Sequence, residues 1–398
     1  MPHSKKKEAG GCCLNEGCIP TKAIMHSSEI FYELKNCAKA GITFEGKIEP
    51  DIKAIIGRKD KIVQSFSKAV EKELIKKGVK IFKENAVIDF EKLEANGIKG
   101  KNIIIATGSI PFELPDFPFD GEKILSSNDV LKLETLPKSI AIIGSGAIGI
   151  EWARIFSNLG VETTVIEKAS NLLPLMDSSI QKRIERIFKI NKIKFHTNRT
   201  AVSYKEGKLL LDDNKEIEAE KILVAVGRKK NLQEGLIINK DLTTNYKNVY
   251  AIGDIAAAKM LAHTASMQAD YIINKILNKN TEIVPDSDIP SVVYGTPEIA
   301  SIGINEQEIK NIEEYKIYET PVSMLPKSWC DNKTEGFIKI ITRNNLIEGA
   351  HIVSNEASSL ITQIQIMMKA GLKISEIKEI VFAHPTYSEG IAETLSNG

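Results

Sequence analysis

The sequence lacks an excess of charge of either sign. Lysine and arginine number 53 and aspartate and glutamate 52, so the formal net charge is +1. Proteins that bind nucleic acid or anionic membranes usually do so through a strong basic excess. The near balance therefore gives no reason to expect either partner. The short Lys5–Lys7 run lies at a terminus and is typical of a solvated tail.

Long apolar runs are also missing. The longest candidate, Ile140–Ile150, contains three glycines and a serine, whereas a membrane-spanning helix needs roughly 18 apolar residues. The N-terminus carries charge with no apolar core behind it, so it does not have the pattern of a secretory signal. We therefore expect no membrane span and a cytoplasmic location.

Cysteine is scarce, because five in 398 residues are too few for a disulfide scaffold. Three of them, Cys12, Cys13 and Cys18, fall within seven positions. Zinc usually takes four ligands, and no second Cys or His pair at ligand spacing is present in the sequence. The spacing favours a redox pair of Cys13 and Cys18 over a zinc site or buried free cysteines. A thiol at a helix N-terminus has a lowered pKa, which makes Cys18 a candidate stable thiolate.

A glycine-rich loop, Gly144–Gly149, follows the apolar run 140–143 and opens a predicted helix, and Glu167 ends the next predicted strand. Alone, the glycines would also suit a simple turn. In this context they permit a tight turn at a pyrophosphate, which the helix N-terminus attracts. An acid at position 167 would bind a ribose 2′-hydroxyl and repel a 2′-phosphate. The pattern predicts NAD rather than NADP, with these contacts: Gly144, Gly146, Ile148, Gly149 and Glu167.

Sequence patterns predict secondary structure in two further regions. A helix is expected from Lys59 to Lys77, ended by Gly78. From about Pro290, strand patterns at 337–342 and 347–353 precede a helix at 355–370, which predicts a separate α+β domain.

His384 lies five residues before Glu389. A histidine oriented by a carboxylate is a plausible proton acceptor for a thiol. Spacing alone, however, favours a structural histidine at this position.

The segment Gly10–Lys22 resembles the redox-active segment of the flavin- and pyridine-nucleotide-dependent disulfide oxidoreductases. Other segments follow in that family's order: Ala106–Gly108, Gly144–Gly149, Ala225–Arg228, Ala251–Asp254, Met260–His263 and His384–Glu389. The resemblance implies an α/β fold with two Rossmann-like dinucleotide-binding domains and a C-terminal α+β dimerisation domain. The implied boundaries are 1–136 for the FAD-binding domain, 137–250 for the NAD-binding domain, 251–287 for a return to the FAD domain and 288–398 for dimerisation.

The resemblance also implies residue roles. Cys13 would exchange with the substrate, Cys18 would lie against the flavin, and His384 would act as base, oriented by Glu389. His384 would serve the disulfide of the other subunit, so the active form would be a homodimer. The implied cofactor contacts are Lys22, Gly108, Asp254 and Ala262 for FAD, with Glu151 pairing Lys22, and Val226 and Gly227 added to the NAD contacts above; no metal is implied.

The implied activity is oxidation of protein-bound dihydrolipoamide to lipoamide, with electrons passing through Cys13–Cys18 and FAD to NAD. The partners would be lipoyl domains of 2-oxo acid dehydrogenase or glycine cleavage complexes. A glutathione reductase would carry basic residues at Glu167–Ala169, and a mercuric reductase would end in a cysteine pair rather than Thr394–Gly398. A flavin-free paralogue that binds NAD and dimerises without catalysis stays open.

Three departures from the family pattern stand out. The family's first strand–loop–helix–strand unit needs roughly 30 residues, but nine residues precede Gly10. The FAD domain is therefore expected to be truncated at its N-terminus, with exposed strand edges and impaired flavin binding. Cys12 replaces a threonine and Thr21 a serine. For Cys12, a harmless small-residue substitution is favoured over a third thiol that scrambles the redox pair.

Overall fold

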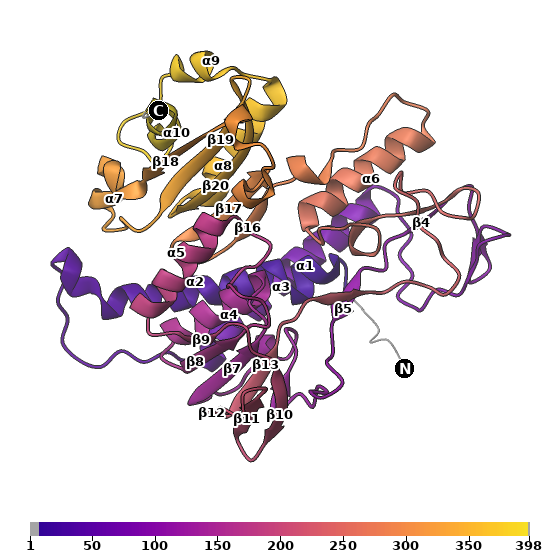
Figure 1. Ribbon diagram of the computed structural model, residues 1–398. Helices are drawn as coiled ribbons and strands as arrows, with labels where there is room; N and C mark the ends of the chain where they lie inside the picture. Colours follow the sequence, from indigo (N-terminus) through magenta and orange to yellow (C-terminus); the bar gives the residue numbers. More distant parts are fainter. Residues whose placement is uncertain (1–7, 397–398) are drawn as a thin grey trace. The chain divides into compact units, whose positions relative to one another are not determined.

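A computed structural model describes residues 8–396, which form two compact units (Figure 1). Unit 1 comprises the described residues up to Ile24, Lys53–Phe112 and Arg228–Asp286. Unit 2 comprises Met25–Ile52, Glu113–Gly227 and the residues from Ser287 onward.

Unit 1 is built on helices and short strand pairs. Its helices are α1 (Gly11–Glu16), the first turns of α2 (Cys18–Lys35), most of α3 (Ile52–Lys76) and α6 (Ala262–Ile276). Its strands are β1 (Ile88–Asp89), β2 (Glu94–Ala95) and β3 (Ile98–Lys99) in one sheet, β4 (Ile103–Ile105) parallel to β15 (Val249–Ala251), and β5 (Ser109–Pro111) antiparallel to β14 (Arg228–Lys230). The core is a small cluster around Ile105, Leu236 and Ala251.

Helix α3 corrects one boundary from the sequence. It begins at Ile52, seven residues before the predicted start at Lys59, and runs through Gly57. Glycine within a helix costs about 1 kcal/mol relative to alanine, yet the helix continues across it. Gly78 lies just beyond the C-terminus with φ 78°, and this confirms the predicted stop.

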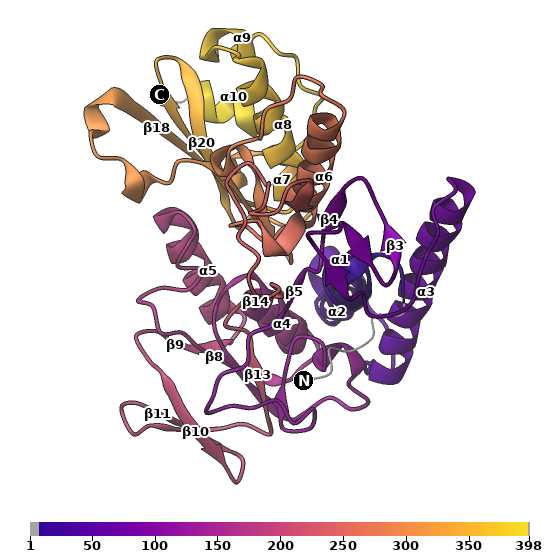
Figure 2. The same cartoon turned by 90° about the vertical axis from the view of Figure 1, so that its right-hand side faces the viewer.

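The first half of unit 2 contains a five-stranded parallel sheet in the order β6-β13-β7-β8-β9. Its strands are β6 (Ile124–Leu125), β7 (Ser139–Ile143), β8 (Glu162–Ile166), β9 (Lys194–His196) and β13 (Lys221–Val224). Helices α4 (Ala147–Asn158) and α5 (Ser178–Ile190) connect them, which confirms the predicted strand–loop–helix–strand unit. A small antiparallel sheet of β10 (Ala201–Lys205), β11 (Lys208–Leu211) and β12 (Glu216–Glu218) extends beside it (Figure 2).

The second half of unit 2 is an antiparallel sheet in the order β16-β17-β20-β19-β18. Its strands are β16 (Ser291–Val293), β17 (Glu298–Gly303), β18 (Tyr315–Pro321), β19 (Phe337–Arg343) and β20 (Leu346–Ser354). Helices α7 (Pro326–Cys330), α8 (Ala357–Ala370), α9 (Ile374–Lys378) and α10 (Glu389–Ser396) complete this half. The strands and helix expected from the sequence after position 335 are confirmed, and Gly371 ends α8 in the left-handed conformation.

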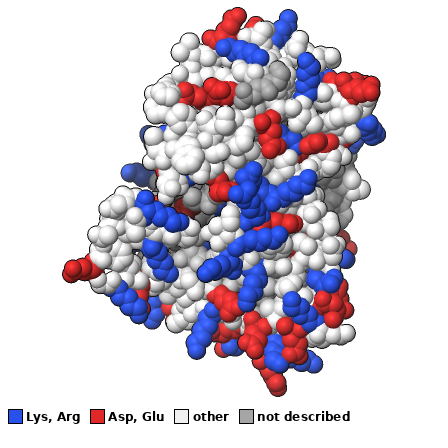
Figure 3. Space-filling model, turned by 60° about the vertical axis from the view of Figure 1, so that its left-hand side comes forward, with Lys and Arg blue, Asp and Glu red and all other residues white. Residues whose placement is uncertain are grey.

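The surface mixes charges of both signs. On the face in Figure 3, basic and acidic side chains lie beside one another over much of the surface. Among residues 8–396, no helix is long and apolar enough to cross a membrane.

Candidate active site

The two cysteines of the predicted redox pair lie at the junction of two helices. Cys13 lies within α1, and Cys18 is the first residue of α2. Hydrogen bonds from the Cys18 side chain and backbone outweigh burial and lower the pKa of the Cys13 thiol to about 7, with a smaller contribution from the charge of Lys22. Both residues are in the reduced form, without a disulfide between them. The pair therefore holds a nucleophile that is partly ionised near neutral pH.

Hydrogen bonds from neighbouring side chains hold this segment in place. Asn15 Nδ2 donates to the Gly11 carbonyl at 2.9 Å and to the Ala9 carbonyl at 3.1 Å. From α3, Ser67 Oγ donates to the same Ala9 carbonyl at 2.8 Å, and Arg58 donates to the Ala23 carbonyl at 2.9 Å. Helix α3 thus fixes both ends of the cysteine segment.

Asp254, a predicted flavin contact, follows strand β15 in unit 1. Its carboxylate accepts a hydrogen bond from the hydroxyl of Ser109, which is 1% exposed. Gly108, beside it, has φ 72°, and Ala262 begins α6. The predicted flavin contacts Lys22, Gly108, Asp254 and Ala262 therefore all lie in unit 1.

The glycine loop of unit 2 has the geometry of a phosphate cradle. Gly144 has φ 101°, and a Cβ there would lie 2.6 Å from the Ala225 carbonyl oxygen. A Cβ on Gly149 would lie 2.0 Å from the Gly144 oxygen, whereas Gly146 faces open space. Two glycines are thus required by close backbone packing, and the third leaves room where a pyrophosphate would approach.

Glu167 directly follows β8 and lies beside this loop. Its Oε2 accepts from the Ser145 backbone N–H at 2.8 Å and from Ser145 Oγ at 2.6 Å, and its Oε1 accepts from the Ala169 N–H at 2.8 Å. The carboxylate is therefore fixed next to the glycine loop, and its contact with a ribose stays a prediction. Ile148 lies in the first turn of α4, and Val226 and Gly227 follow β13.

Glu151, expected to pair with Lys22, is 5% exposed in α4. Its Oε1 accepts a hydrogen bond from the backbone N–H of Tyr294 at 3.0 Å. No local sequence pattern predicts this contact, which links α4 to the start of the second half of unit 2.

His384 and Glu389 are brought together as the sequence suggested. His384 Nδ1 lies 2.8 Å from Glu389 Oε1, and the other carboxylate oxygen accepts from the Thr386 N–H at 2.8 Å. The Thr386 amide, with His384, lowers the pKa of the Glu389 carboxyl. The histidine side chain is 67% exposed, so its ring is held at one nitrogen and open to solvent at the other.

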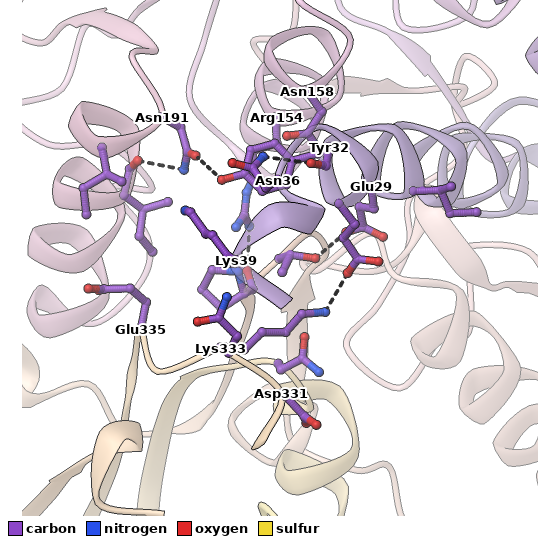
Figure 4. Close-up of a pocket in the computed structure, with 18 of the residues that line it drawn as sticks. Glu29, Tyr32, Asn36, Lys39, Arg154, Asn158, Asn191, Asp331, Lys333 and Glu335 are labelled. Atoms are coloured by element: carbon purple, nitrogen blue, oxygen red, sulfur yellow. Dashed lines mark hydrogen bonds and ion pairs between the residues drawn. The ribbon is translucent and has the colours of Figure 1, made fainter. Parts of the chain in front are cut away.

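Unit 2 also contains a cavity of about 770 Å³ that the sequence did not reveal (Figure 4). Tyr32 donates from its hydroxyl to Asn191 Oδ1 at 3.4 Å beside it, and Lys333 pairs with Glu33 at 2.9 Å. None of the predicted site residues lines this cavity. Within residues 8–396, no group of three or more His, Cys, Asp or Glu side chains could hold a metal ion.

Comparison with known proteins identifies the family of the chain. A family model described as pyridine nucleotide-disulphide oxidoreductase matches residues 7–269, and the dimerisation domain of that family matches residues 289–395. The chain belongs to this family. It is therefore an oxidoreductase, from a family that uses FAD and NAD(H).

Within the family, the chain is similar to proteins named dihydrolipoyl dehydrogenase. The chain is 33% identical to the mitochondrial dihydrolipoyl dehydrogenase of Pisum sativum over 98% of its own length and 84% of the relative. It is also 33% identical to dihydrolipoyl dehydrogenase 3 of Haloarcula marismortui, over 99% and 90% of the two chains. The crystal structure of LpdA from Mycobacterium tuberculosis has the same fold, with a TM-score of 0.89 at 22% identity, covering 98% and 91%.

The residues present fit NAD and part of the flavin. The open face at Gly146 and the fixed Glu167 carboxylate suit a pyrophosphate and an adenosine ribose. In unit 1, the Asp254 carboxylate, held by Ser109, suits a polyol hydroxyl of FAD.

Proposed function

We propose that this chain is a dihydrolipoyl dehydrogenase that oxidises a dihydrolipoyl dithiol with NAD as electron acceptor. The observation that carries the proposal is the Cys18–Cys13 hydrogen bond, which lowers the pKa of Cys13 to about 7. A thiol that ionises near neutral pH is both an able nucleophile and a good leaving group in disulfide exchange. The relatives named dihydrolipoyl dehydrogenase, matched over almost the whole chain, support the choice of substrate.

The protein's own residues carry the proton and sulfur chemistry. With Cys13 and Cys18 as a disulfide, His384 of one subunit takes a proton from the substrate dithiol bound at the other subunit. The substrate thiolate attacks Cys13, and the substrate's second sulfur then closes the lipoyl ring. Two thiols remain on Cys13 and Cys18. FAD supplies, when bound, the two-electron chemistry that links these thiols to NAD.

Glu389 has a positioning role in this scheme. Its hydrogen bond to His384 Nδ1 leaves Nε2 to exchange the proton. The carboxylate also stabilises the imidazolium that forms when His384 takes the proton. The partner molecules are lipoyl domains of 2-oxo acid dehydrogenase or glycine cleavage complexes, and the site residues are those named from the sequence.

An assay of the parent protein and two variants tests the proposal. The purified protein should show a flavin spectrum and reduce NAD in the presence of dihydrolipoamide. Cys18→Ser should abolish dithiol oxidation while sparing electron transfer from NADH to a dye. Cys37→Ser, which removes a thiol of unit 2, should leave both activities unchanged. A colourless protein that binds NADH without oxidising the dithiol would overturn the proposal in favour of the flavin-free paralogue.

Mixing two inactive variants tests the shared site. Cys13→Ser and His384→Gln should each be inactive as homodimers. A heterodimer of the two keeps one site with both Cys13 and His384 intact. Random mixing should therefore restore about a quarter of the wild-type activity if the dimer is twofold symmetric. Activity that stays at zero, with heterodimers demonstrated, would count against a site shared between subunits.

A further inference from the structure

The segment 168–177 connects Glu167 to helix α5 and borders the glycine loop. Within it, the Leu173 N–H donates to the Ser145 carbonyl at 3.2 Å. Ser145 is also the residue whose backbone N–H and hydroxyl donate to Glu167 Oε2. A shift of the segment would therefore move Ser145, and with it the donors that hold the carboxylate predicted to bind the ribose.

The C-terminal end of this segment is held by the second half of unit 2. Asp177, 0% exposed, accepts from the Glu306 N–H at 2.8 Å through Oδ2 and pairs with Lys339 Nζ at 2.8 Å through Oδ1. Lys339 lies in β19, and Glu306 begins the short 3₁₀ helix η5 (Glu306–Glu308). A buried carboxylate with these partners fixes the end of the segment to that half.

Gln307, in the middle of η5, adds two hydrogen bonds at the same end. Its Oε1 accepts from the Ser178 N–H at 3.1 Å, and its Nε2 donates to the Met176 carbonyl at 3.0 Å. The amide thus holds the backbone on both sides of Asp177. Because Gln307 is exposed, its replacement should cost little stability, whereas a change at the buried Asp177 should cost much more.

Further hydrogen bonds continue from Gln307 to the glycine loop. The Met176 N–H donates to the Leu173 carbonyl at 2.9 Å, and the Leu173 N–H in turn donates to Ser145. Leu173 is 3% exposed and has φ 51°, a conformation that leucine rarely adopts unless its surroundings hold it. The segment is therefore tied at both ends, and the ties form one contiguous network.

We propose that Gln307 is a positioning residue for the adenosine half of NAD, through which the second half of unit 2 holds the nucleotide loop in its binding geometry. That half matches the dimerisation domain of the family. The inference rests on the proposed function, because it takes Glu167 as the ribose contact. Gln307 itself touches no nucleotide in this scheme. It restricts the segment 168–177 in advance, so the segment loses less freedom when the dinucleotide binds.

Matched glutamine variants test the proposal by fluorescence titration with NADH. Gln307→Met keeps the length of the side chain and removes both hydrogen bonds. It should weaken NADH binding about fivefold, the lower end of the couplings measured between sites. Gln365→Met removes a similar hydrogen bond in the same half, from Nε2 to the Asp288 carbonyl at 2.9 Å, and should leave the affinity unchanged. An unchanged affinity in Gln307→Met would overturn the proposal.

Two fragments of the dinucleotide separate positioning from general damage. ADP-ribose carries the adenosine half and nicotinamide mononucleotide the other half, and each is measured by its displacement of NADH. Gln307→Met should weaken ADP-ribose by the same factor as NADH and leave nicotinamide mononucleotide nearly unchanged. In turnover, the KM for NAD should rise by that factor at constant kcat. Equal weakening of both fragments would overturn the proposal, because a disturbed fold would produce it.

The parent protein distinguishes failure of this inference from failure of the proposed function. A parent protein that does not bind NADH would remove both. A parent protein that binds NADH, with a Gln307→Met variant of equal affinity, would remove only the positioning role. The titrations need neither flavin nor turnover, so weaker binding by Gln307→Met would support the role even in a protein that does not oxidise the dithiol.

Discussion

The two units bury their side chains in different ways. Unit 2 contains large apolar clusters, in which residues such as Ile352 and Ile222 are 0% exposed. The apolar cluster around Ile105 in unit 1 is small, and helix α3 leaves Phe66 56% and Ile75 60% exposed. The glycine loop predicted to bind NAD and the His384–Glu389 pair thus lie on a well-packed unit, whereas the cysteine segment is held by hydrogen bonds from neighbouring side chains. Stability and redox chemistry should therefore respond to different substitutions.

The largest expected effect is at a buried ion cluster of unit 2. Lys339 Nζ, 1% exposed, lies 2.8 Å from Asp177 Oδ1 and also pairs with Glu306. Lys339→Met leaves the buried Asp177 carboxylate without its cation and should lower the free energy of unfolding by about 3–5 kcal/mol. Urea denaturation measures the loss.

Two further variants control this result. Lys316→Met, on the exposed side of β18, should stay within about 0.5 kcal/mol of the parent protein. Asp177→Asn added to Lys339→Met should recover part of the loss, because it removes the stranded charge. A Lys339→Met protein as stable as the parent would show that the cluster contributes nothing.

Apolar packing gives the next contrast between the units. Ile352→Ala removes a fully buried side chain from the second half of unit 2 and should cost about 2–5 kcal/mol. Ile75→Ala removes an exposed side chain from α3 of unit 1 and should change stability by about 0.5 kcal/mol or less. Similar losses for both variants in urea would mean that α3 is buried in the working protein.

Acid should weaken unit 2 through the same cluster. Burial lowers the pKa of His351 below its ordinary 6.5, so the folded state stays neutral where the unfolded state binds a proton. Burial raises the pKa of Asp177, but His351, Lys339 and backbone amides outweigh it, and the net pKa lies below 3.8. Stability should therefore fall as the pH drops below about 6.5 and fall again below 3.8.

A single substitution separates the two acid effects. His351→Gln should flatten the stability profile between pH 7 and 5, measured as the urea midpoint. It should reduce the further loss below pH 3.8 without abolishing it, because Lys339 and the backbone amides still lower the pKa of Asp177. An unchanged slope between pH 7 and 5 would assign that acid sensitivity to other groups.

Two glycines, one in each unit, provide the last comparison. Gly149→Ala brings a Cβ to 2.0 Å from the Gly144 oxygen and should weaken NADH binding about tenfold by deforming the cradle. Gly57→Ala, in open space within α3, should leave NADH binding unchanged and add about 0.5–1 kcal/mol of stability. Fluorescence titration with NADH checks both, and equal affinities would remove the close-packing role of Gly149.

Sequence patterns predicted those parts of the fold that depend on residues close together in the sequence. The strand, loop and helix around Gly144 follow from periodicity and glycine placement, and Glu167 follows from its position at a strand end. The contact between Cys12 and Arg228 joins residues 216 positions apart, and that between Lys339 and Asp177 joins residues 162 apart. A periodic sequence pattern cannot predict such pairs, because residues so far apart in the sequence come into contact only when the chain folds.

The cysteine pair shows a subtler limit of local reasoning. The helix N-terminus led us to expect the favoured thiolate on Cys18. In the structure, the hydrogen bond from the Cys18 side chain, with a smaller contribution from the Cys18 backbone N–H, lowers the pKa of Cys13 to about 7, which the sequence did not predict. The expected role of Cys18 beside the flavin stays a prediction.

The carboxylate of Glu167 is already engaged before any nucleotide arrives. Oε2 has both lone pairs occupied by Ser145, whereas Oε1 receives only the Ala169 amide and keeps one acceptor direction. The ribose hydroxyl that the sequence predicts at this position would therefore meet Oε1 rather than Oε2, unless the serine hydroxyl rotates away.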